Sequence, residues 1–338
     1  MKIPFSVLDL APISEGESIA RALDNSKQLA IQAEQCGYRR VWLAEHHGMK
    51  GVASSATAVV LTHIANATTH IRVGSGGIML PNHAPLVIAE QFGTLATLFP
   101  QRIDLGLGRA PGTDMATAKA LRRNLNNDVD NYPDDILTLQ HYLGTPEQRQ
   151  SIVAVPGANT HVPLWLLGSS LYSAQLAARL GLPYSFASHF APDALFDAIH
   201  VYRSMFSASA QCEKPYTMVG VMAVVADTEE QAKYLFTSVQ QQFIAMRRGG
   251  NQPFAKPVDD INAICSPTDK AMLDNILRYA VVGTKETVAQ KLAQFIETTE
   301  ADELIVSTPI HDIKARLKSI KLLSEIDLMA NKDSYTVE

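Results

Sequence analysis

Residues 41–47, Val-Trp-Leu-Ala-Glu-His-His, join a short apolar run to three side chains that can move protons or hold a ligand. Residues 71–77 (Ile-Arg-Val-Gly-Ser-Gly-Gly) and 103–109 (Ile-Asp-Leu-Gly-Leu-Gly-Arg) are built in the same way. The three runs lie about thirty residues apart, which suits a strand, a helix and the next parallel strand. Because the carboxyl ends of parallel strands meet at one rim, we expect these residues to surround a single pocket.

Strand-like and helix-like segments alternate along the rest of the chain. Apolar runs of strand length occur at 3–8, 41–44, 71–75, 103–107, 164–167, 184–187, 218–225 and 304–307. Segments with helical periodicity occur at 18–36, 55–67, 85–98, 171–180, 192–207, 228–246 and 312–325. This order predicts an α/β protein, and the length of 338 residues suits one (β/α)8 TIM barrel over residues 1–338. Two doubly wound sheets would alternate too, and strand count alone does not separate the two folds.

Two stretches break the period and are expected to be insertions at the barrel rim. Residues 145–162 and 248–267 are rich in glycine and proline, which disfavour helix. Long loops in compact domains often act as lids, and the second stretch is either such a lid or an ordinary surface excursion.

Composition restricts the class of protein. The net charge of -5 and the pI near 6.1 leave no dominant basic patch, so a nucleic-acid partner is not expected. We expect neither a signal peptide nor a membrane span, because no long apolar run is present. The three cysteines are odd in number and far apart, which favours reduced thiols and a cytoplasmic location.

The adjacent histidines are expected to play different parts. On an extended chain His46 and His47 point in opposite directions, so at most one of them faces the barrel mouth. Imidazole titrates near neutral pH and can transfer protons, although a structural pair that fixes the loop is the simpler alternative. Glu45 is expected to be a buried hydrogen-bond partner rather than a base.

Glycines, an arginine and serines follow the neighbouring strands. Gly76 and its neighbours permit a flat ring to approach the main chain, although a bend at the rim explains them equally well. Arg109 can grip a phosphate through two parallel hydrogen bonds, or form a rim salt bridge. Ser169 and Ser170 precede a helix, where backbone N–H groups bind anions, although ordinary capping needs no ligand. Together with Arg109, these serines resemble a phosphate clamp.

Taken in order, these motifs resemble those of the bacterial luciferase-like family of flavin-dependent monooxygenases, which are (β/α)8 barrels. The resemblance covers nearly the whole chain and is carried by segments 43–48, 71–81, 106–109, 167–173, 177–183 and 282–286. It implies a reduced FMN that reacts with O2 and passes one oxygen atom to a small organic substrate. It also implies a catalytic acid/base role for His46, the first histidine of the Glu-His-His motif.

The resemblance further implies which residues bind FMN. Its phosphate would be held by Arg109 and by the serine turn, whose members are Ser169, Ser170 and Ser173. A cis peptide bond beneath the ring would fall at Ser75, Gly76 or Gly77. This chain has Gly108 and Ser169 where luciferase has a cysteine and a glutamate, so light emission and aldehyde specificity are not carried over.

Partners and alternatives follow from the same comparison. The chain lacks a dinucleotide fingerprint, so we expect NAD(P)H to act through a separate flavin reductase. A homodimer is expected by analogy with the family. A deazaflavin-dependent oxidoreductase and a non-catalytic flavin-binding protein remain alternatives. A metal-dependent hydrolase using His46, His47 and His83 is disfavoured, because adjacent histidines do not easily share one metal; no metal is expected.

Overall fold

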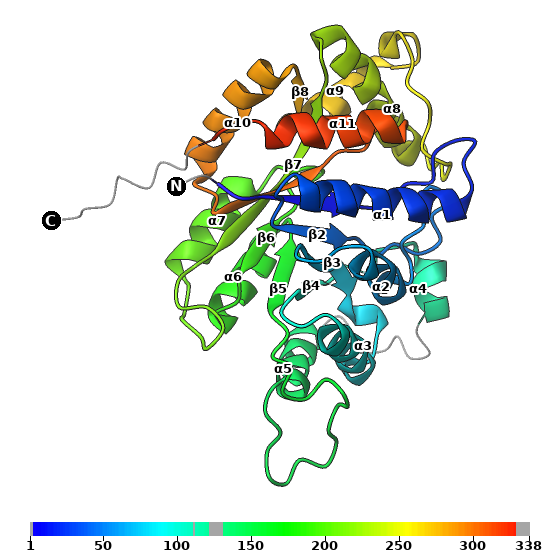
Figure 1. Cartoon of the computed structure of the whole chain (residues 1–338). Helices are drawn as coiled ribbons and strands as arrows, with labels where there is room; N and C mark the ends of the chain where they lie inside the picture. Colours follow the sequence, from blue (N-terminus) through cyan, green and yellow to red (C-terminus); the bar gives the residue numbers. More distant parts are fainter. Residues whose placement is uncertain (1–2, 111, 122–130, 329–338) are drawn as a thin grey trace, which may run out of the picture.

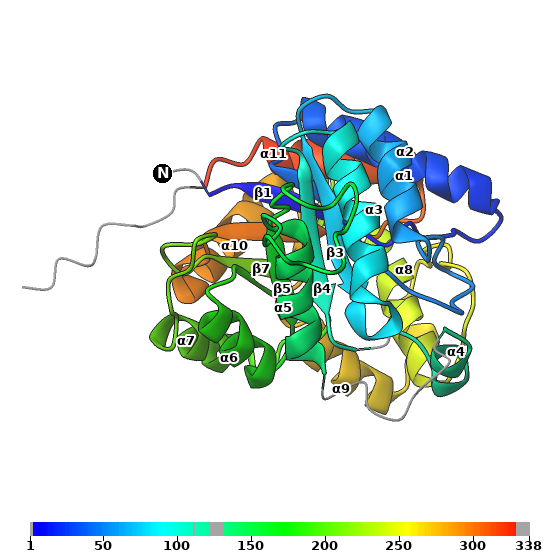
Figure 2. The same cartoon turned by 90° about the horizontal axis from the view of Figure 1, so that it is seen from below.

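The computed structural model describes residues 3–110, 112–121 and 131–328. Parallel strands occupy the centre and helices surround them (Figures 1 and 2). The strands are β1 (Phe5–Asp9), β2 (Arg40–Leu43), β3 (Arg72–Met79), β4 (Ile103–Gly108), β5 (Leu164–Gly168), β6 (Tyr184–Phe186), β7 (Thr217–Val225), β8 (Val281–Gly283) and β9 (Glu303–Ser307).

Eight of these strands close into a barrel. Their order is β6-β5-β4-β3-β2-β1-β9-β7, and a further pairing of β6 with β7 completes the ring. Every pairing between strands is parallel. These eight strands correspond to the eight runs predicted from the sequence, so the TIM-barrel prediction is confirmed. Strand β8 was not predicted; it pairs with the last three residues of β7, outside the ring.

In the described ranges, seven predicted helices are present and four others were missed. The predicted helices are α1 (Ile19–Gln35), α2 (Thr57–Asn66), α3 (Pro85–Leu98), α6 (Leu171–Leu180), α7 (Leu195–Ser204), α8 (Glu229–Arg247) and α11 (Ile313–Ser324). The missed helices are α4 (Met115–Leu121), α5 (Tyr132–Leu143), α9 (Pro267–Ile276) and α10 (Lys285–Thr299). Short 3-10 turns occur at η1 (Leu80–Asn82) and η2 (Ile261–Ala263). Among the described helices, none combines the length and apolar character needed for a membrane span.

Alternation along the strands separates two apolar layers. In β2, Val41 and Leu43 belong to the main core between the strands and the outer helices. Trp42 lies between them in sequence and points the other way, into the barrel, where it packs with Leu8, Trp165, Met218 and Ile305. A strand residue that shares the side of Trp42 or Met218 therefore faces the barrel interior.

A buried ionic network fills the barrel below Trp42. Arg40 lies 2.7 Å from Asp104 and 2.8 Å from Glu303, and these side chains are 3%, 1% and 0% exposed. Ser6 donates a hydrogen bond to Glu303, and Arg72 pairs with Asp104 from the neighbouring strand. Because each buried charge has an opposite partner, the network closes the amino-terminal end of the barrel without an unpaired ion.

The two predicted rim insertions lie outside the barrel strands. Residues 145–162 form an irregular loop between α5 and β5. Residues 248–267 contain η2, and Phe254 exchanges backbone hydrogen bonds with Ile13 and Glu15 of the segment after β1. Asn251 bonds to the backbone of Gly48 and Lys50, each at 2.7 Å. The second insertion is therefore anchored beside the loops that follow β1 and β2; whether it opens as a lid stays a prediction.

Candidate functional site

The loop after β2 carries a three-residue hydrogen-bonded cluster. Glu45 is 1% exposed, and its Oε1 lies 2.7 Å from Nε2 of His47 and 2.7 Å from Nε2 of His83. Its Oε2 accepts from the backbone N–H of Met79 at 3.1 Å, at the end of β3. Burial alone would raise the pKa of Glu45, but the bonds from His83, His47 and Met79 hold it below its usual value. Glu45 is thus a buried hydrogen-bond partner, as the sequence predicts, and the structure adds that it ties the ends of β2 and β3 together.

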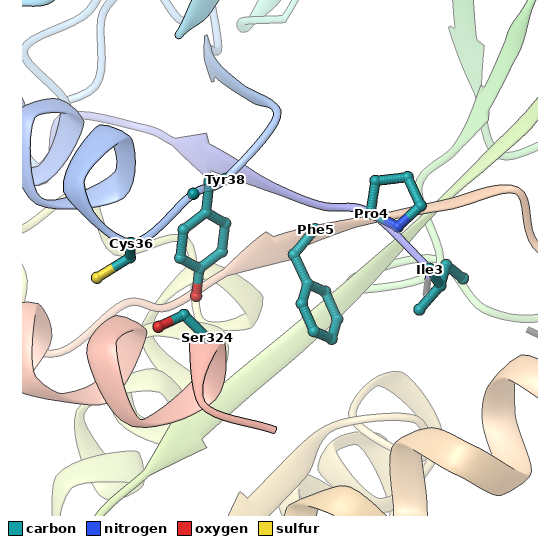
Figure 3. Close-up of a pocket in the computed structure, with 7 residues that line it drawn as sticks. Ile3, Pro4, Phe5, Cys36, Tyr38 and Ser324 are labelled. Atoms are coloured by element: carbon teal, nitrogen blue, oxygen red, sulfur yellow. The ribbon is translucent and has the colours of Figure 1, made fainter. Parts of the chain in front are cut away.

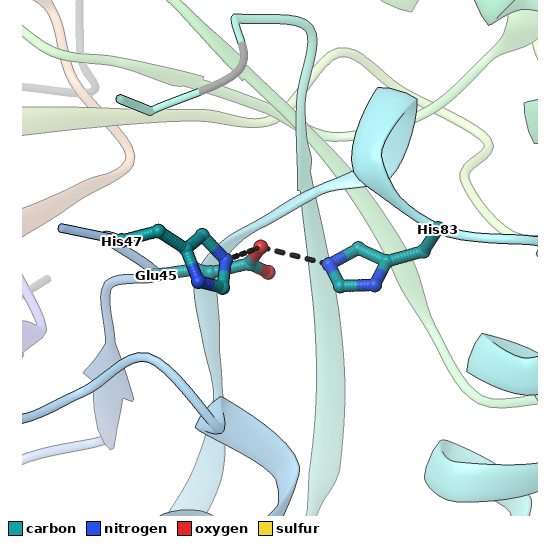
Figure 4. A group of neighbouring side chains, drawn as sticks. All are labelled: Glu45, His47 and His83. Atoms are coloured by element: carbon teal, nitrogen blue, oxygen red, sulfur yellow. Dashed lines mark hydrogen bonds and ion pairs between the residues drawn. The ribbon is translucent and has the colours of Figure 1, made fainter. Parts of the chain in front are cut away.

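The same cluster has the composition of a metal site. One ligand atom from each of Glu45, His47 and His83 lies within 4.8 Å of the others. Figure 4 shows the Glu45 carboxylate between the two imidazoles, with a hydrogen bond to each. Ligand atoms on a tetrahedral zinc ion are separated by about 3.3 Å, more than these hydrogen-bonded distances. The geometry favours hydrogen bonds, and the absence of a metal stays a prediction.

His46 takes different partners from His47. Its Nδ1 lies 3.2 Å from the carbonyl oxygen of Gly112, which can only accept a hydrogen bond, so Nδ1 carries the proton. Burial lowers the pKa of His46, and the bond to Gly112 only partly offsets this effect. At neutral pH the ring is therefore uncharged, and its Nε2 carries a lone pair that has no hydrogen-bond partner among the residues that the structure describes.

The glycines of β3 and β4 serve barrel packing. A Cβ at Gly74 would come within 2.5 Å of the Asp104 carbonyl oxygen, and one at Gly106 within 2.2 Å of the Ser75 carbonyl oxygen. Ser75 itself is buried and donates its hydroxyl to the Gly106 carbonyl at 2.8 Å. The two strands approach each other so closely that a side chain at either glycine would separate them. The cis peptide bond expected here joins Gly76 to Gly77.

Arg109 follows β4, and its side chain reaches the start of α6. Its guanidinium carbon is 4.3 Å from the ring centre of Tyr172, in the first turn of the helix. Arg109 is exposed, and among the described residues it has no acidic partner. Ser170 is the N-cap of α6, but its side chain makes no capping bond. Within the described part of the chain, a guanidinium without an acidic partner thus lies beside backbone N–H groups that Ser170 does not cap, a combination suited to an anion.

The other predicted serines differ in accessibility. Ser169 is partly exposed and follows β5 directly. Ser173 is buried, where its Oγ donates to the Ser170 carbonyl at 2.9 Å and lies 3.1 Å from the Tyr184 hydroxyl. Ser173 therefore shapes the turn from inside, whereas Ser169 and Ser170 can present hydroxyl groups to a ligand.

His189 was missed by sequence reasoning. It follows β6 and has a buried Nδ1 with no partner among the described residues. Burial lowers the pKa of His189 to about 4, so the ring is neutral at physiological pH. The signal was present, because Ser188 and His189 come directly after the sixth apolar run, as His46 does after the second.

A surface hollow at the opposite end of the barrel is separate from these residues. It is lined mainly by Ile3, Phe5, Tyr38 and Ser324, near the start of β1 (Figure 3). The Tyr38 hydroxyl donates to the Ile320 carbonyl at 2.7 Å and is already satisfied. The hollow contains no set of acid, base and nucleophile.

Comparison with known proteins identifies the family. The chain is 50% identical over 324 residues to a luciferase-like monooxygenase of Escherichia coli K12, covering 96% of this chain and 97% of that protein. It is 30% identical to an N-acetyl-S-alkylcysteine monooxygenase of Bacillus subtilis, covering 98% and 100% of the two chains. The crystal structure of apo-MsnO8 is 33% identical, with a TM-score of 0.85 and coverage of 96% and 98%.

More distant solved structures share the fold alone. The oxygenating constituent of 3,6-diketocamphane monooxygenase from Pseudomonas putida, solved with FMN, is 19% identical with a TM-score of 0.74; it covers 98% of this chain and 100% of its own. A secondary alcohol dehydrogenase that depends on the coenzyme F420 is 14% identical with a TM-score of 0.68; the coverage is 96% and 98%. The family model for luciferase-like monooxygenases matches residues 3–302. The chain belongs to the luciferase-like monooxygenase family.

Proposed function

We propose that this protein is an FMN-dependent monooxygenase that uses reduced FMN and O2 to oxygenate a small organic substrate. The observation that carries the proposal is the contact between Arg109 and Tyr172. It brings a guanidinium that has no acidic partner among the described residues from the end of β4 to the start of α6, where the N-cap side chain makes no capping bond. A phosphate carries two negative charges at neutral pH, so this pairing of a cation with helix N–H groups suits the phosphate of FMN.

The remaining residues suit the ring and the substrate. Reduced FMN, when bound, supplies the two electrons needed to activate O2. Gly76 and Gly77 add no side chains to the rim beside the β2 loop. His46 is neutral, with its Nδ1 proton held by Gly112, so its Nε2 can accept a proton from a reacting group and return it. The Glu45 cluster fixes the loop that carries His46.

The source of reduced flavin and the subunit arrangement are part of the proposal. A separate NAD(P)H-dependent flavin reductase would supply the reduced cofactor.

Val59 on α2, and Val87 and Leu98 on α3, are 71%, 45% and 58% exposed. Apolar residues on adjacent helices mark a surface suited to another copy of the chain, so we propose a homodimer through α2 and α3. All three cysteines are free, in keeping with a cytoplasmic location.

Two alternatives share the same fold. A deazaflavin would also place a phosphate and a tricyclic ring at the mouth, but it would transfer hydride rather than activate O2. A flavin-binding protein without turnover would keep the Arg109 contact and lose the need for His46. Oxygenation and binding must therefore be measured separately.

The test is oxygen transfer with supplied reduced FMN. Isotopically labelled O2 is used with thioethers such as N-acetyl-S-methylcysteine, and with ketones, aldehydes, sulfonates and aromatic compounds. We expect one labelled oxygen atom in the product, and peroxide release is measured alongside. His46→Ala should lower product formation by about a hundredfold while changing FMN affinity by less than about threefold. Peroxide without product for every substrate class contradicts the proposal.

A further inference from the structure

The segment after β6 lies beside the serine turn and over β7. Phe186 pairs with Gly168 of β5, and the next residue, Ala187, donates its N–H to the Gly168 carbonyl at 3.0 Å. Ser188 donates its hydroxyl to the Gly220 carbonyl in β7 at 2.5 Å. His189 is thus held at the carboxyl ends of the strands, next to the turn that contains Ser169 and Ser170.

The imidazole of His189 occupies the barrel interior. Val219 and Val221 belong to the outer core, whereas Met218 packs inside the barrel with Trp42 and Trp165. By alternation, position 220 faces inward with Met218. A Cβ at Gly220 would lie 2.3 Å from His189 Nδ1, so the ring fills the space that this glycine leaves. No larger residue at position 220 would allow this placement.

The contact with Gly220 decides which nitrogen of His189 carries the proton. Nδ1 is buried 2.3 Å from the position that a Cβ of residue 220 would take, and it has no hydrogen-bond partner among the described residues. A lone pair directed at a C–H group is weakly favourable, whereas an N–H directed there would meet another hydrogen. The neutral ring therefore carries its proton on Nε2. His189 as a whole keeps some accessible surface whereas its Nδ1 has none, so Nε2 is the ring nitrogen left to meet a ligand.

His189 follows a strand on the opposite side of the barrel from the strand that precedes His46. Strands β2 and β6 are separated by three strands in either direction around the closed ring. The two histidines are also opposite in character, because His46 offers a lone pair at Nε2 and His189 offers an N–H. A ligand in the mouth would meet an acceptor on the β2 side and a donor on the β6 side.

We propose that His189 is a further ligand-binding residue of this site and that its Nε2–H donates a hydrogen bond to a carbonyl oxygen of the flavin ring. The inference rests on the proposed function. The segment of His189 borders the turn proposed to hold the phosphate, so a ring extending from that phosphate into the barrel passes this donor. The pyrimidine end of an isoalloxazine carries two carbonyl oxygens, which are acceptors with no proton of their own.

The first test uses the ligand-free protein. Nitrogen-15 labelled protein is studied by long-range proton–nitrogen correlation at pH 7, which separates the two neutral tautomers and the charged ring. The His189 signals are assigned by their loss in His189→Gln, with the exposed His200 on α7 and its His200→Gln variant as the matched control. We expect the Nε2–H tautomer for His189. A charged ring or the Nδ1–H tautomer overturns the inference, whatever the cofactor proves to be.

The second test is titration of oxidised FMN into the wild type and two variants. The amide nitrogen of glutamine reaches the position of Nε2, whereas that of asparagine reaches only the position of Nδ1. His189→Asn should weaken FMN binding about tenfold and shift the visible spectrum of bound FMN, while His189→Gln should stay within about threefold of the wild type. Circular dichroism confirms that each variant is folded.

The outcomes separate this inference from the proposed function. If the wild type binds FMN and folded His189→Asn binds it equally well, the hydrogen bond to the ring is refuted and the proposed function stands. If His189→Gln loses as much affinity as His189→Asn, the donor at Nε2 is not what matters, and the inference is again refuted. If the wild type binds no FMN, the proposed function fails.

Discussion

Removal of the His189 imidazole should change how the stability of the fold depends on pH. Burial lowers the pKa of His189 from its ordinary value of 6.5 to about 4, so the unfolded chain binds a proton here more readily than the folded chain. Above pH 6.5 neither state is protonated, and the residue contributes nothing to the pH dependence. As the pH falls from 6.5 toward 4, protonation stabilises the unfolded chain alone and the free energy of unfolding falls. Below about pH 4 both states are protonated and the loss is complete.

The size of the effect follows from the same shift. A fall in pKa from 6.5 to about 4 corresponds to about 3 kcal/mol for a fully buried ring. Because His189 keeps some accessible surface, water screens part of this penalty, and we expect about 1 to 3 kcal/mol. His189→Gln has no titrating group at this position and should lose correspondingly less stability on acidification.

The assay is urea denaturation of the wild type and His189→Gln at pH 7 and at about pH 4.5. The difference between their free energies of unfolding should change by about 1 to 3 kcal/mol between the two pH values, with the wild type losing more. The exposed His200 gives a control, since the free energy of unfolding of His200→Gln should change between the two pH values by as much as that of the wild type. If His189→Gln lost as much stability as the wild type between the two pH values, the burial of a neutral imidazole would be refuted.

Three further substitutions test the packing of the barrel and the site by urea denaturation. Arg40→Met leaves Glu303 without its buried partner and should cost about 3 to 5 kcal/mol, whereas Lys318→Met breaks an exposed pair and should cost less than about 1 kcal/mol; similar losses would contradict the buried network. Gly106→Ala places a Cβ 2.2 Å from a backbone oxygen of β3 and should cost more than about 3 kcal/mol, so near-native stability would contradict the close strand approach. Glu45 accepts hydrogen bonds from His47, His83 and the Met79 N–H, and Glu45→Gln turns an amide N–H toward one of these donors. The free energy of unfolding should fall by about 1 to 3 kcal/mol, and an unchanged value would contradict the hydrogen-bonded cluster.

The barrel could be predicted because two independent features of the sequence indicate its strands. Each of the eight ring strands is an apolar run, and several end in glycine, histidine or arginine, so pattern and position agree. Strand β8 carries no such mark, since Val281–Gly283 is only three residues long and lies outside the ring. Helix α9 begins at Pro267, the last residue of the glycine- and proline-rich insertion, and its capping box of Ser266 and Asp269 spans the boundary between them.

The site could be predicted only in part, because sequence shows which residues end a strand and not which partners they find. Strand alternation predicts different parts for His46 and His47, and the two side chains do have different hydrogen-bond partners. The bond from His83 to Glu45 joins positions 38 residues apart and leaves no local pattern. Ser75 was predicted at the cofactor, but its hydroxyl is directed to β4 and bonds the Gly106 carbonyl. The sequence does not show that a hydroxyl on a strand already bonds a carbonyl of the neighbouring strand.

The central claim is that the mouth of this barrel binds a flavin through its phosphate, and a comparison of FMN with riboflavin tests it most directly. The two ligands share the ring and differ in the phosphate, so their affinities for the wild type isolate the contribution of Arg109 and the start of α6. We predict that FMN binds the wild type at least about tenfold more tightly than riboflavin, and that Arg109→Met removes most of this difference. Equal affinities of the wild type for FMN and riboflavin, or no binding of either, would contradict the account.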